Sequence, residues 1–445
     1  ELQVKIPWAR PYIGQIEKQE VEDSMNTGWV SMGPKVSALE QKLSSLLGVK
    51  HSVAVNSGTA ALDIALKIFE VSRGDEIIVP AMTYIATVNA VTYNAATPVP
   101  VDIDPNSFNI DVNLIEQSIT ANTKGIAVID YGGNPANYDR LKEISDEHNL
   151  FLLQDGAHSI GGFYKGKSLC SMGDICTVSF HAAKTITTVE GGAIFVQSEE
   201  HDYSSKVLRS QGEDFVGKYS HTMLGHNYRM SDLHAAVGLG QFSRYEDIMN
   251  DRKRLADQYN SRLAQLSDVI GFIETNNDGV NAWFLYSILV EKRDQVKDYM
   301  KERGVDTRVS WPLPVYDQPL YKGTMDHVAC PVSEKFGVPM IEAEGASRSL
   351  FTQGWKYLFA VLSTSEQYLS TAIELAAQKA SDPSKVKVAM AFESDPFSMD
   401  VRAGVVDTMK KYGMKAIIDD QLPADLSDMS TTLTKVKALK PDQYK

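Results

Sequence analysis

Short apolar runs alternate with segments of helical periodicity through the N-terminal half of the chain, and this alternation is the feature that most limits its fold. Short apolar runs rich in branched side chains are typical of buried strands. They occur at His51–Val55, Glu76–Val79, Pro98–Val101, Gly125–Ile129, Leu150–Leu153, Ile175–Phe180 and Ala193–Val196. Helical periodicity lies between several of them, at Thr59–Phe69, Ile85–Val91, Asn113–Ile119 and Asn137–His148. We therefore predict an α/β fold in which helices cover both faces of a mostly parallel sheet.

Downstream of this region the pattern changes twice. Residues Ser231–Leu266 read as one long helix, and Ile270–Gly345 read as mixed α+β, which predicts a smaller second domain. A new α/β pattern then begins, with strands predicted at Val386–Phe392 and Lys415–Ile418 and helices at Glu366–Ala380, Met399–Tyr412 and Ser430–Ala438. Two strands and three helices are too few for a complete α/β domain. We therefore predict that this segment is part of such a domain.

The net charge of the chain is −13, which makes nucleic-acid binding a poor hypothesis because that binding depends on cationic contacts to phosphate. The charge is compatible with a local positive site for a small anion. We find no uninterrupted apolar run of about 18 residues, so no membrane partner is expected. The 3 cysteines cannot form a disulfide framework, and the chain opens on Glu-Leu-Gln-Val-Lys without an apolar leader. These features predict a cytoplasmic protein.

Two charged residues follow predicted strands, at the edge where open α/β sheets bind ligands. Asp155 ends the apolar run that begins at Leu150, and Lys184 follows the predicted strand Ile175–Phe180. Enzymes that use pyridoxal phosphate (PLP) need this pair, because a lysine holds the aldehyde as a Schiff base and an acid keeps the pyridine nitrogen protonated. Taken alone, each residue is better explained as a solvated charge at a strand end.

A phosphate site is predicted where the first strand meets the first helix, in Asn56-Ser57-Gly58-Thr59-Ala60-Ala61. Small residues with free backbone amides at a helix N-terminus cradle phosphate, although an ordinary N-cap by Ser57 or Thr59 explains the segment equally well. Ser179 offers a second hydroxyl upstream of the lysine. Tyr84 offers an aromatic ring that could stack on a flat cofactor or pack in the core.

Several longer motifs occur in a fixed order. They are Gly28–Pro34, Asn56–Leu62, Gly74–Pro80, Val101–Asp104, Gln154–His158, the Lys184 segment Ser179–Gly192, and Gly225–Met230. Over about residues 8 to 341 the sequence resembles the DegT/DnrJ/EryC1/StrS family, aminotransferases that act on keto-sugars attached to nucleotides. The resemblance implies the PLP-dependent transferase fold of type I, with a large PLP-binding domain at 1–235 and a small domain at 236–344.

The resemblance also implies a role for each motif residue. Lys184 would carry the cofactor and shuttle protons, and Asp155 would pair with the pyridinium nitrogen. His158 would contact the 3′-oxygen of the ring, and Tyr84 would cover one ring face. The phosphate would be held by Ser57, Gly58, Thr59 and Ser179 of one subunit and by Asn227 across a dimer interface. The active unit would be a homodimer, and glutamate would be the amino donor.

The sequence departs from the family pattern in the active-site loop and in the small domain. A glycine is common in the family where Val189 stands, so a positive φ there would strain the valine. The Pro-Leu-His common in the small domain is Pro312-Leu313-Pro314 here, which removes an imidazole near the substrate. The match stops near Ile341, before the strand and helix that usually complete the small domain.

The last segment, 345–445, resembles a different protein class. Its motifs at Ser347–Gly354, Lys387–Ser398 and Leu433–Asp442 are similar to an internal piece of a type I periplasmic solute-binding protein of the branched-chain amino-acid kind. The resemblance covers about a third of such a protein, so a working ligand cleft is not expected. We interpret the segment as a fused or misassembled fragment, with a genuine accessory domain as the alternative.

These observations lead to one main functional hypothesis and several alternatives. The main hypothesis is a PLP-dependent aminotransferase that converts a nucleotide-linked keto-sugar to an amino-sugar, with ping-pong half-reactions. One alternative is transamination of a cyclitol or related ring ketone. Another is PLP-dependent sugar dehydration, against which Lys184 argues, because such family members typically have histidine there. A solute-binding fragment fused to an inactive enzyme is the alternative from another protein class.

Overall fold

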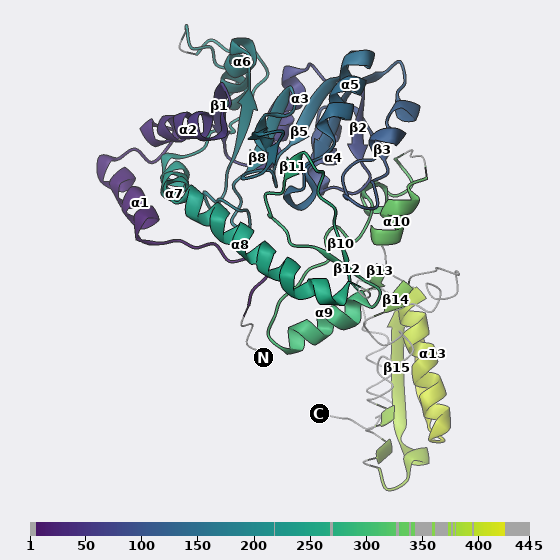
Figure 1. Cartoon of the computed structure of the whole chain (residues 1–445). Helices are drawn as coiled ribbons and strands as arrows, with labels where there is room; N and C mark the ends of the chain where they lie inside the picture. The colour runs from purple at the N-terminus through teal and green to yellow at the C-terminus, as the bar shows by residue number, and fades with distance from the viewer. Residues whose placement is uncertain are drawn as a thin grey trace. The chain divides into compact units, whose positions relative to one another are not determined.

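The computed structural model describes residues 6–217, 219–267, 270–325, 329–337, 340–342, 358–360, 373–374, 377–378, 380–393 and 396–422. The chain divides into two compact units, Glu1–Gly337 and Val338–Lys445. Figure 1 shows a central sheet flanked by helices in the first unit. In the described part of the chain, no helix combines the length and the apolar character needed to cross a membrane.

Every apolar run predicted as a strand in the N-terminal half forms a strand of one central sheet. Its seven strands have the order β1-β9-β8-β5-β4-β2-β3. Their bounds are β1 His51–Val55, β2 Glu76–Pro80, β3 Thr97–Val101, β4 Thr123–Ile129, β5 Phe151–Asp155, β8 Ile175–Ser179 and β9 Gly192–Val196. The predicted α/β fold with a mostly parallel sheet is therefore confirmed.

The directions of the strands decide which strand ends meet. Neighbours pair in parallel from β3 through β2, β4 and β5 to β8. Strand β9 is antiparallel to both β8 and β1, so β1 runs in the same direction as β8. The carboxyl ends of all strands except β9 therefore lie along one edge of the sheet, which we call the carboxyl edge.

Helices cover both faces of the sheet because side chains alternate along each strand. Val53 and Val55 point into one apolar cluster and Ala54 into another. The first cluster includes side chains from α3 (Gly58–Ile68), α4 (Ile85–Tyr93) and α6 (Glu199–Arg209). The opposite face packs against α2 (Pro34–Leu47), α5 (Tyr138–His148) and α7 (Asp232–Ser243). The result is the three-layer arrangement visible in Figure 1.

The predicted helix at Asn113–Ile119 is wrong. The segment forms two short 3-10 turns, η1 (Val112–Leu114) and η2 (Glu116–Ser118). The carboxylate of Asp111 accepts a hydrogen bond from the Asn113 N–H at 3.0 Å. This local cap stabilises a tight turn at the start of the segment, where a longer helix was expected.

The predicted long helix at Ser231–Leu266 is two helices, α7 and α8 (Tyr245–Leu263), followed by the turn η5 (Ala264–Leu266). The chain bends at Arg244, whose φ of −112° and ψ of 19° are not helical. The Arg244 guanidinium pairs with the buried carboxylate of Glu17 on α1 (Gln15–Thr27). A contact with the start of the chain therefore coincides with the break, and no glycine or proline marks it.

Helices α2 and α7 are joined by one buried carboxylate. Asp232, the first residue of α7, is fully buried. It accepts hydrogen bonds from the backbone N–H groups of Gly33, Lys35 and Val36 at 2.9, 3.1 and 3.0 Å. These N–H groups at the start of α2 have no acceptor within their own helix, so the carboxylate both caps α2 and fixes it against α7.

The rest of the first unit has the mixed α+β character predicted for the small domain. Strand β10 (Ile270–Phe272) pairs with β12 (Ile288–Val290), and β11 (Gly279–Val280) joins the hairpin of β6 (Phe163–Tyr164) and β7 (Lys167–Ser168). Helices α9 (Arg293–Glu302) and α10 (Pro331–Gly337) follow, with the 3-10 turn η6 (Val315–Asp317) between them. The buried Asp102 after β3 accepts hydrogen bonds from Val332 and Ser333, which fixes the start of α10.

In the second unit, β13 (Met340–Glu342) pairs in parallel with β14 (Leu358–Ala360). Strand β15 (Lys387–Glu393), helix α13 (Pro396–Lys411) and strand β16 (Lys415–Leu422) form a second parallel pair with its connecting helix. These three elements lie close to the predicted positions. Of the two other helices predicted in this unit, Glu366–Ala380 falls largely, and Ser430–Ala438 wholly, outside the described residues.

Replacing Asp232 with alanine is expected to lower the free energy of unfolding by about 3 kcal/mol, because three backbone donors lose their buried acceptor. The control is Ser198→Ala, which removes the N-cap of α6, a bond to a single N–H group. That control is expected to cost about 1 kcal/mol. Urea unfolding of both variants gives the two values, and equal losses would contradict the double role of Asp232.

Candidate active site

The residues predicted to form the site gather along the carboxyl edge of the sheet. Asp155 is the last residue of β5 and Ser179 the last residue of β8. Ser57 follows β1, Tyr84 follows β2, and Lys184 follows β8 by a few residues. Because these strands run in one direction, segments far apart in the sequence converge at one edge.

Lys184 lies half-buried in the loop between β8 and β9. Its ammonium lies 4.7 Å from the ring centroid of Phe284, which comes from the segment between β11 and β12. Burial disfavours the charged form and lowers the pKa of Lys184 to about 8, with the charge of Asp155 partly opposing the shift. The lowered pKa increases the fraction of neutral amine near physiological pH, and the neutral amine is the nucleophile that attachment to an aldehyde requires.

Asp155 is buried and has too few partners to offset the loss of water. The Thr87 hydroxyl donates to Oδ2 at 2.7 Å and the Ala157 N–H donates to Oδ1 at 3.2 Å. Burial raises the pKa of Asp155, against the opposing effects of Thr87, the Lys184 charge and Ala157. Among the described residues, Asp155 forms no ion pair, and Lys184 acts on it only through its charge. A buried carboxylate in this state is stabilised by a cationic ligand such as a protonated pyridine ring.

His158 is buried between aromatic rings. Its imidazole stacks on Phe284 with centroids 4.1 Å apart and lies parallel to Trp311 at 5.6 Å. The Gly132 N–H donates to Nδ1 at 3.3 Å. Burial, together with the positive charge of Lys184, lowers the pKa of His158 well below its ordinary value, so the ring is neutral at physiological pH.

The N-terminus of α3 forms a close-packed cradle beside these groups. Ser57 is its N-cap and accepts a hydrogen bond from the Ala60 N–H at 3.1 Å. A Cβ added to Gly58 would lie 2.9 Å from the Cβ of Ser179, so only glycine allows this approach. The Ser179 hydroxyl and the first amides of α3, including that of Thr59, therefore come together. Amides at a helix N-terminus attract a phosphate group.

Tyr84 and Asn227 are placed differently from the buried core of the site. Tyr84 is the N-cap residue of α4 and is 60% exposed, so its ring is accessible to a ligand. Asn227 has an exposed side chain, while its backbone oxygen accepts a hydrogen bond from the Asn56 Nδ2 at 3.4 Å. This contact holds the Asn227 backbone beside the phosphate cradle, and its side chain remains accessible.

Both departures from the family pattern have structural consequences. Val189 has a φ of 73°, a left-handed conformation that costs a β-branched residue about 1–2 kcal/mol. The Val189 N–H donates to the Thr187 hydroxyl at 2.8 Å, which helps to hold the strained loop. Pro314 precedes Val315, whose N–H donates to the Ala81 carbonyl at 2.8 Å, so this segment reaches the end of β2.

Sequence reasoning missed three residues that contact the site. Thr87 carries the strongest hydrogen bond to Asp155, and Phe284 and Trp311 enclose His158. Thr87 could have been found from its position one helical turn after Tyr84, near the end of β2. The two aromatic residues come from a region without clear periodicity, and only the packing of this region against the sheet identifies them.

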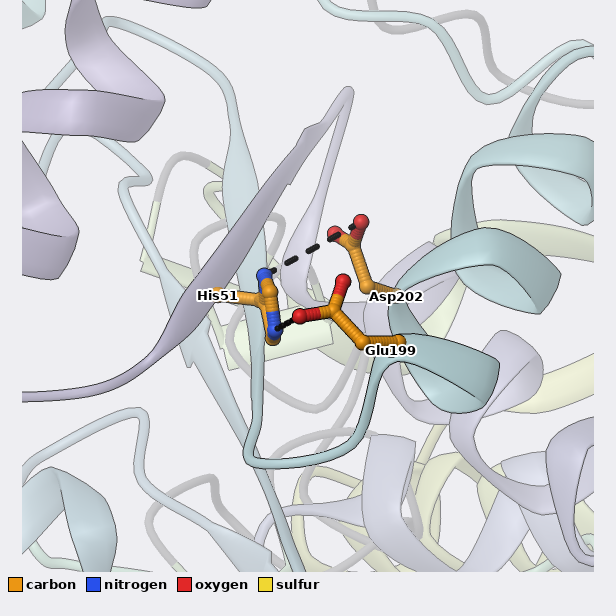
Figure 2. A group of neighbouring side chains, drawn as sticks. All are labelled: His51, Glu199 and Asp202. Carbon is orange, nitrogen blue, oxygen red and sulfur yellow. Dashed lines mark ion pairs between the residues drawn. The ribbon is translucent and has the colours of Figure 1, made fainter.

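A second group of titratable side chains lies at the opposite edge of the sheet, where His51 begins β1 (Figure 2). The two imidazole nitrogens face different carboxylates, Glu199 at 3.3 Å and Asp202 at 4.0 Å. Lys50 and Lys206 already pair with these carboxylates at 3.0 and 2.6 Å. One metal ion would bind only one imidazole nitrogen and would displace the lysines, so we interpret the group as an ion-pair cluster.

The residues at the carboxyl edge fit PLP on chemical grounds. Lys184 would supply a half-buried amine for the aldehyde, and Asp155 would supply a buried carboxylate for the ring nitrogen. The start of α3 and Ser179 would supply donors for the phosphate. Each reactive part of the cofactor therefore has a partner of matching charge or hydrogen-bonding character.

The lowered pKa of Lys184 predicts how fast PLP attaches to the cofactor-free protein. Only the neutral amine attacks an aldehyde, so the attachment rate is expected to rise with pH and level off above about 8, the pKa of Lys184. Stopped-flow absorbance after addition of PLP measures this rate, with Lys184→Ala as the control that shows no attachment. A rate that keeps rising towards pH 10.5 would mean that Lys184 has the pKa of an exposed lysine.

Comparisons with known proteins agree with this chemistry. GDP-perosamine synthase from Caulobacter vibrioides is 36% identical over 310 residues, which cover 68% of this chain and 84% of that protein. A Streptococcus pneumoniae protein assigned as a sugar aminotransferase has been solved in PLP and pyridoxamine phosphate (PMP) forms. Its PLP form is 31% identical, with a TM-score of 0.71 over 74% of this chain and 91% of that chain. PseC from Helicobacter pylori, an aminotransferase involved in the biosynthesis of pseudoaminic acid, is 28% identical, with a TM-score of 0.70 over 74% and 91%.

The model of the DegT/DnrJ/EryC1/StrS aminotransferase family matches residues 11–342. This range contains the whole carboxyl edge and every residue predicted for the site. The match, the related sequences and the solved PLP and PMP forms lead to the same assignment. The chain belongs to the DegT/DnrJ/EryC1/StrS family of PLP-dependent aminotransferases.

Proposed function

We propose that this enzyme transfers an amino group from glutamate to the keto carbon of a nucleotide-linked sugar. The observation that supports this most strongly is the pair formed by half-buried Lys184 and buried Asp155 at the carboxyl edge. A half-buried lysine with its pKa lowered to about 8, near a buried carboxylate that has no ion-pair partner among the described residues, is the arrangement that transamination requires.

Each of these two residues has a distinct task in the proposed reaction. Bound PLP supplies an electron sink for the electrons released when a proton leaves the amino donor. The buried carboxylate of Asp155 would hold a proton on the ring nitrogen, because an adjacent cation stabilises a negative charge in this position. The neutral Nζ of Lys184 takes a proton from the α-carbon of the donor and returns one to the sugar carbon.

The surrounding residues would orient the ring and exclude water. His158 is neutral and can donate from Nε2 to the 3′-oxygen, and Tyr84 is exposed where it can cover a ring face. Phe284 and Trp311 form apolar walls beside His158 and so limit the access of water to Lys184. The start of α3 would bind the phosphate and thereby fix the position of the reacting carbon relative to Lys184.

The choice of substrate rests on related proteins. GDP-perosamine synthases from Caulobacter vibrioides and Escherichia coli are named for an amino-sugar attached to a nucleotide. A third relative, from Bacillus subtilis, is named for the biosynthesis of a spore coat polysaccharide. We therefore place this enzyme in polysaccharide biosynthesis and favour a nucleotide-linked keto-sugar over a free cyclitol ketone.

Incubating the enzyme with glutamate and a panel of GDP-, UDP- and dTDP-linked keto-sugars is expected to yield an amino-sugar from at least one of them. Mass spectrometry of the product measures the exchange of a carbonyl oxygen for an amine. Lys184→Ala is expected to abolish both turnover and the cofactor adduct that borohydride traps on the protein. Asp155→Ala should retain some PLP but lose nearly all turnover, because a neutral pyridine is a poor electron sink.

The outcomes separate the alternatives. Turnover of a free cyclitol ketone with none of the nucleotide sugars would replace the proposed substrate class. A borohydride-trapped adduct on a lysine other than Lys184 would remove the proposed catalytic residue. Loss of the sugar hydroxyl without amination would identify a dehydratase.

We also propose that two copies of the chain share each active site. Asn227 has an exposed side chain beside the phosphate cradle of its own subunit, which leaves it available to a partner. The preceding loop exposes large apolar side chains, with Phe215, Val216 and Leu224 at 61%, 91% and 88% exposure. Exposed apolar patches of this kind mark protein interfaces. A symmetric homodimer would bury the loop and bring Asn227 to the other subunit's phosphate.

Mixing inactive variants tests this arrangement. A heterodimer of Lys184→Ala and Asn227→Ala subunits has one intact site, so random exchange of subunits should restore about a quarter of wild-type activity. Mixing Lys184→Ala with Asp155→Ala is the matched control, because both residues act in the same subunit and no intact site can form. Equal recovery in both mixtures, or none in the first, would contradict shared sites.

We propose, finally, that residues 345–445 take no part in the chemistry. Every residue assigned a role lies in the first compact unit, which ends at Gly337, and the family match ends at residue 342. In the second unit, Met390, Val405 and Met409 belong to a separate small apolar cluster. The described part of the second unit therefore has apolar packing of its own, and the resemblance of the segment to a solute-binding protein stays a prediction.

A further inference from the structure

A fully buried carboxylate lies behind the active site and takes no direct part in the proposed chemistry. Asp130 follows β4 and is 0% exposed. Its Oδ1 accepts hydrogen bonds from the Ala136 N–H at 3.0 Å and the Tyr138 hydroxyl at 2.8 Å. Its Oδ2 accepts from the Gln154 Nε2 at 2.7 Å and the Ser159 hydroxyl at 2.6 Å. Four donors converge on one anion, and each of them would lose a charge-assisted bond if the carboxylate were removed.

Two of these donors adjoin residues of the active site. Gln154 immediately precedes Asp155, and Ser159 immediately follows His158. Gln154 has little freedom, because its Nε2 also donates to the Leu169 carbonyl at 2.6 Å. Asp130 therefore ties the end of β4 to both sides of the turn that carries Asp155 and His158.

The chain after Asp130 makes a second connection to the same histidine. The Gly132 N–H donates to Nδ1 of His158 at 3.3 Å. Since an N–H group cannot accept a hydrogen bond, Nδ1 must carry a lone pair and the ring proton must be on Nε2. Stacking on Phe284 and Trp311 limits the tilt of the ring. The tautomer of His158 therefore depends on the position of the Tyr131–Gly132 peptide, which Asp130 anchors from the preceding residue.

We propose that Asp130 is a positioning residue that acts through Ser159 and Gly132 to hold His158 as its Nε2–H tautomer. This form can donate a hydrogen bond to an anionic oxygen of the cofactor, a role that rests on the proposed function. Without the network the imidazole could place its proton on Nδ1 and present only an acceptor to that oxygen. The expected consequence is weaker PLP binding and an altered protonation equilibrium of the Lys184-linked cofactor.

Two matched variants separate positioning from general stability. Ser159→Ala and Tyr138→Phe each remove one hydroxyl bond to the same carboxylate, at 2.6 and 2.8 Å. Ser159 is bonded to His158 along the chain, whereas Tyr138 belongs to α5. Both should lower the thermal midpoint, but only the serine variant should alter the behaviour of His158.

The experiment uses full-length protein labelled with 15N-histidine, with and without PLP. For Ser159→Ala we expect about tenfold weaker PLP binding, a shifted pH midpoint of the visible absorption band, and His158 nitrogen shifts that indicate mixed tautomers. Tyr138→Phe should keep the wild-type values of all three. Unchanged His158 shifts in Ser159→Ala, or equal changes in both variants, would overturn the proposal. The His158 tautomer is also measured in the cofactor-free protein. If the wild-type protein failed to bind PLP, the proposed function would be refuted, but the tautomer comparison between the two variants would still test the role of Asp130.

Discussion

The burial of a carboxylate at the end of a central strand is the constraint on which the active site depends. Asp155 loses its hydration at the carboxyl edge and, within the described part of the chain, its carboxylate accepts two hydrogen bonds, from Thr87 and Ala157. Taking a charge out of water costs several kcal/mol unless an opposite charge is adjacent, so the site is incomplete without a cation. In the proposed function the protonated ring of PLP supplies that cation. Burial also lowers the pKa of Lys184. The exclusion of water from this site therefore shifts the pKa values of both groups.

Buried aspartates also join distant parts of the first unit, where backbone N–H groups take the place of a cation. Asp232 fixes the start of α2 to α7, and Asp102 fixes the start of α10 to the end of β3. Asp130 accepts from one backbone N–H group and from three side chains, those of Tyr138, Gln154 and Ser159. The difference between a structural and a functional carboxylate is therefore the number of donors around it. Asp155 accepts fewer hydrogen bonds than Asp130, so its carboxylate oxygens can still accept a hydrogen bond from a ligand.

Local strain is found beside the site. Val189 and Trp311 both have left-handed backbone conformations, with φ values of 73° and 45°. Val189 lies in the loop that carries Lys184, and Trp311 stacks on His158. Such conformations persist only where the surrounding contacts hold them, as the Thr187 hydroxyl does for Val189. The loop that carries Lys184 is therefore strained at Val189, and the hydrogen bond from Val189 to Thr187 helps to hold that conformation.

Short continuous apolar runs in the sequence determined the strands of the sheet, because strands that are buried on both faces leave such runs whatever their distant contacts are. They also placed Asp155 and Lys184 after strands, and strand direction then brings them to one edge. Tertiary structure alone decided the break at Arg244, since the contact with Glu17 comes from the start of the chain. It alone decided that Phe284 and Trp311 enclose His158, because aromatic residues in an irregular segment carry no periodic signal. Local patterns thus specify the elements and their order, whereas the partners of each buried charge depend on contacts between residues far apart in the sequence.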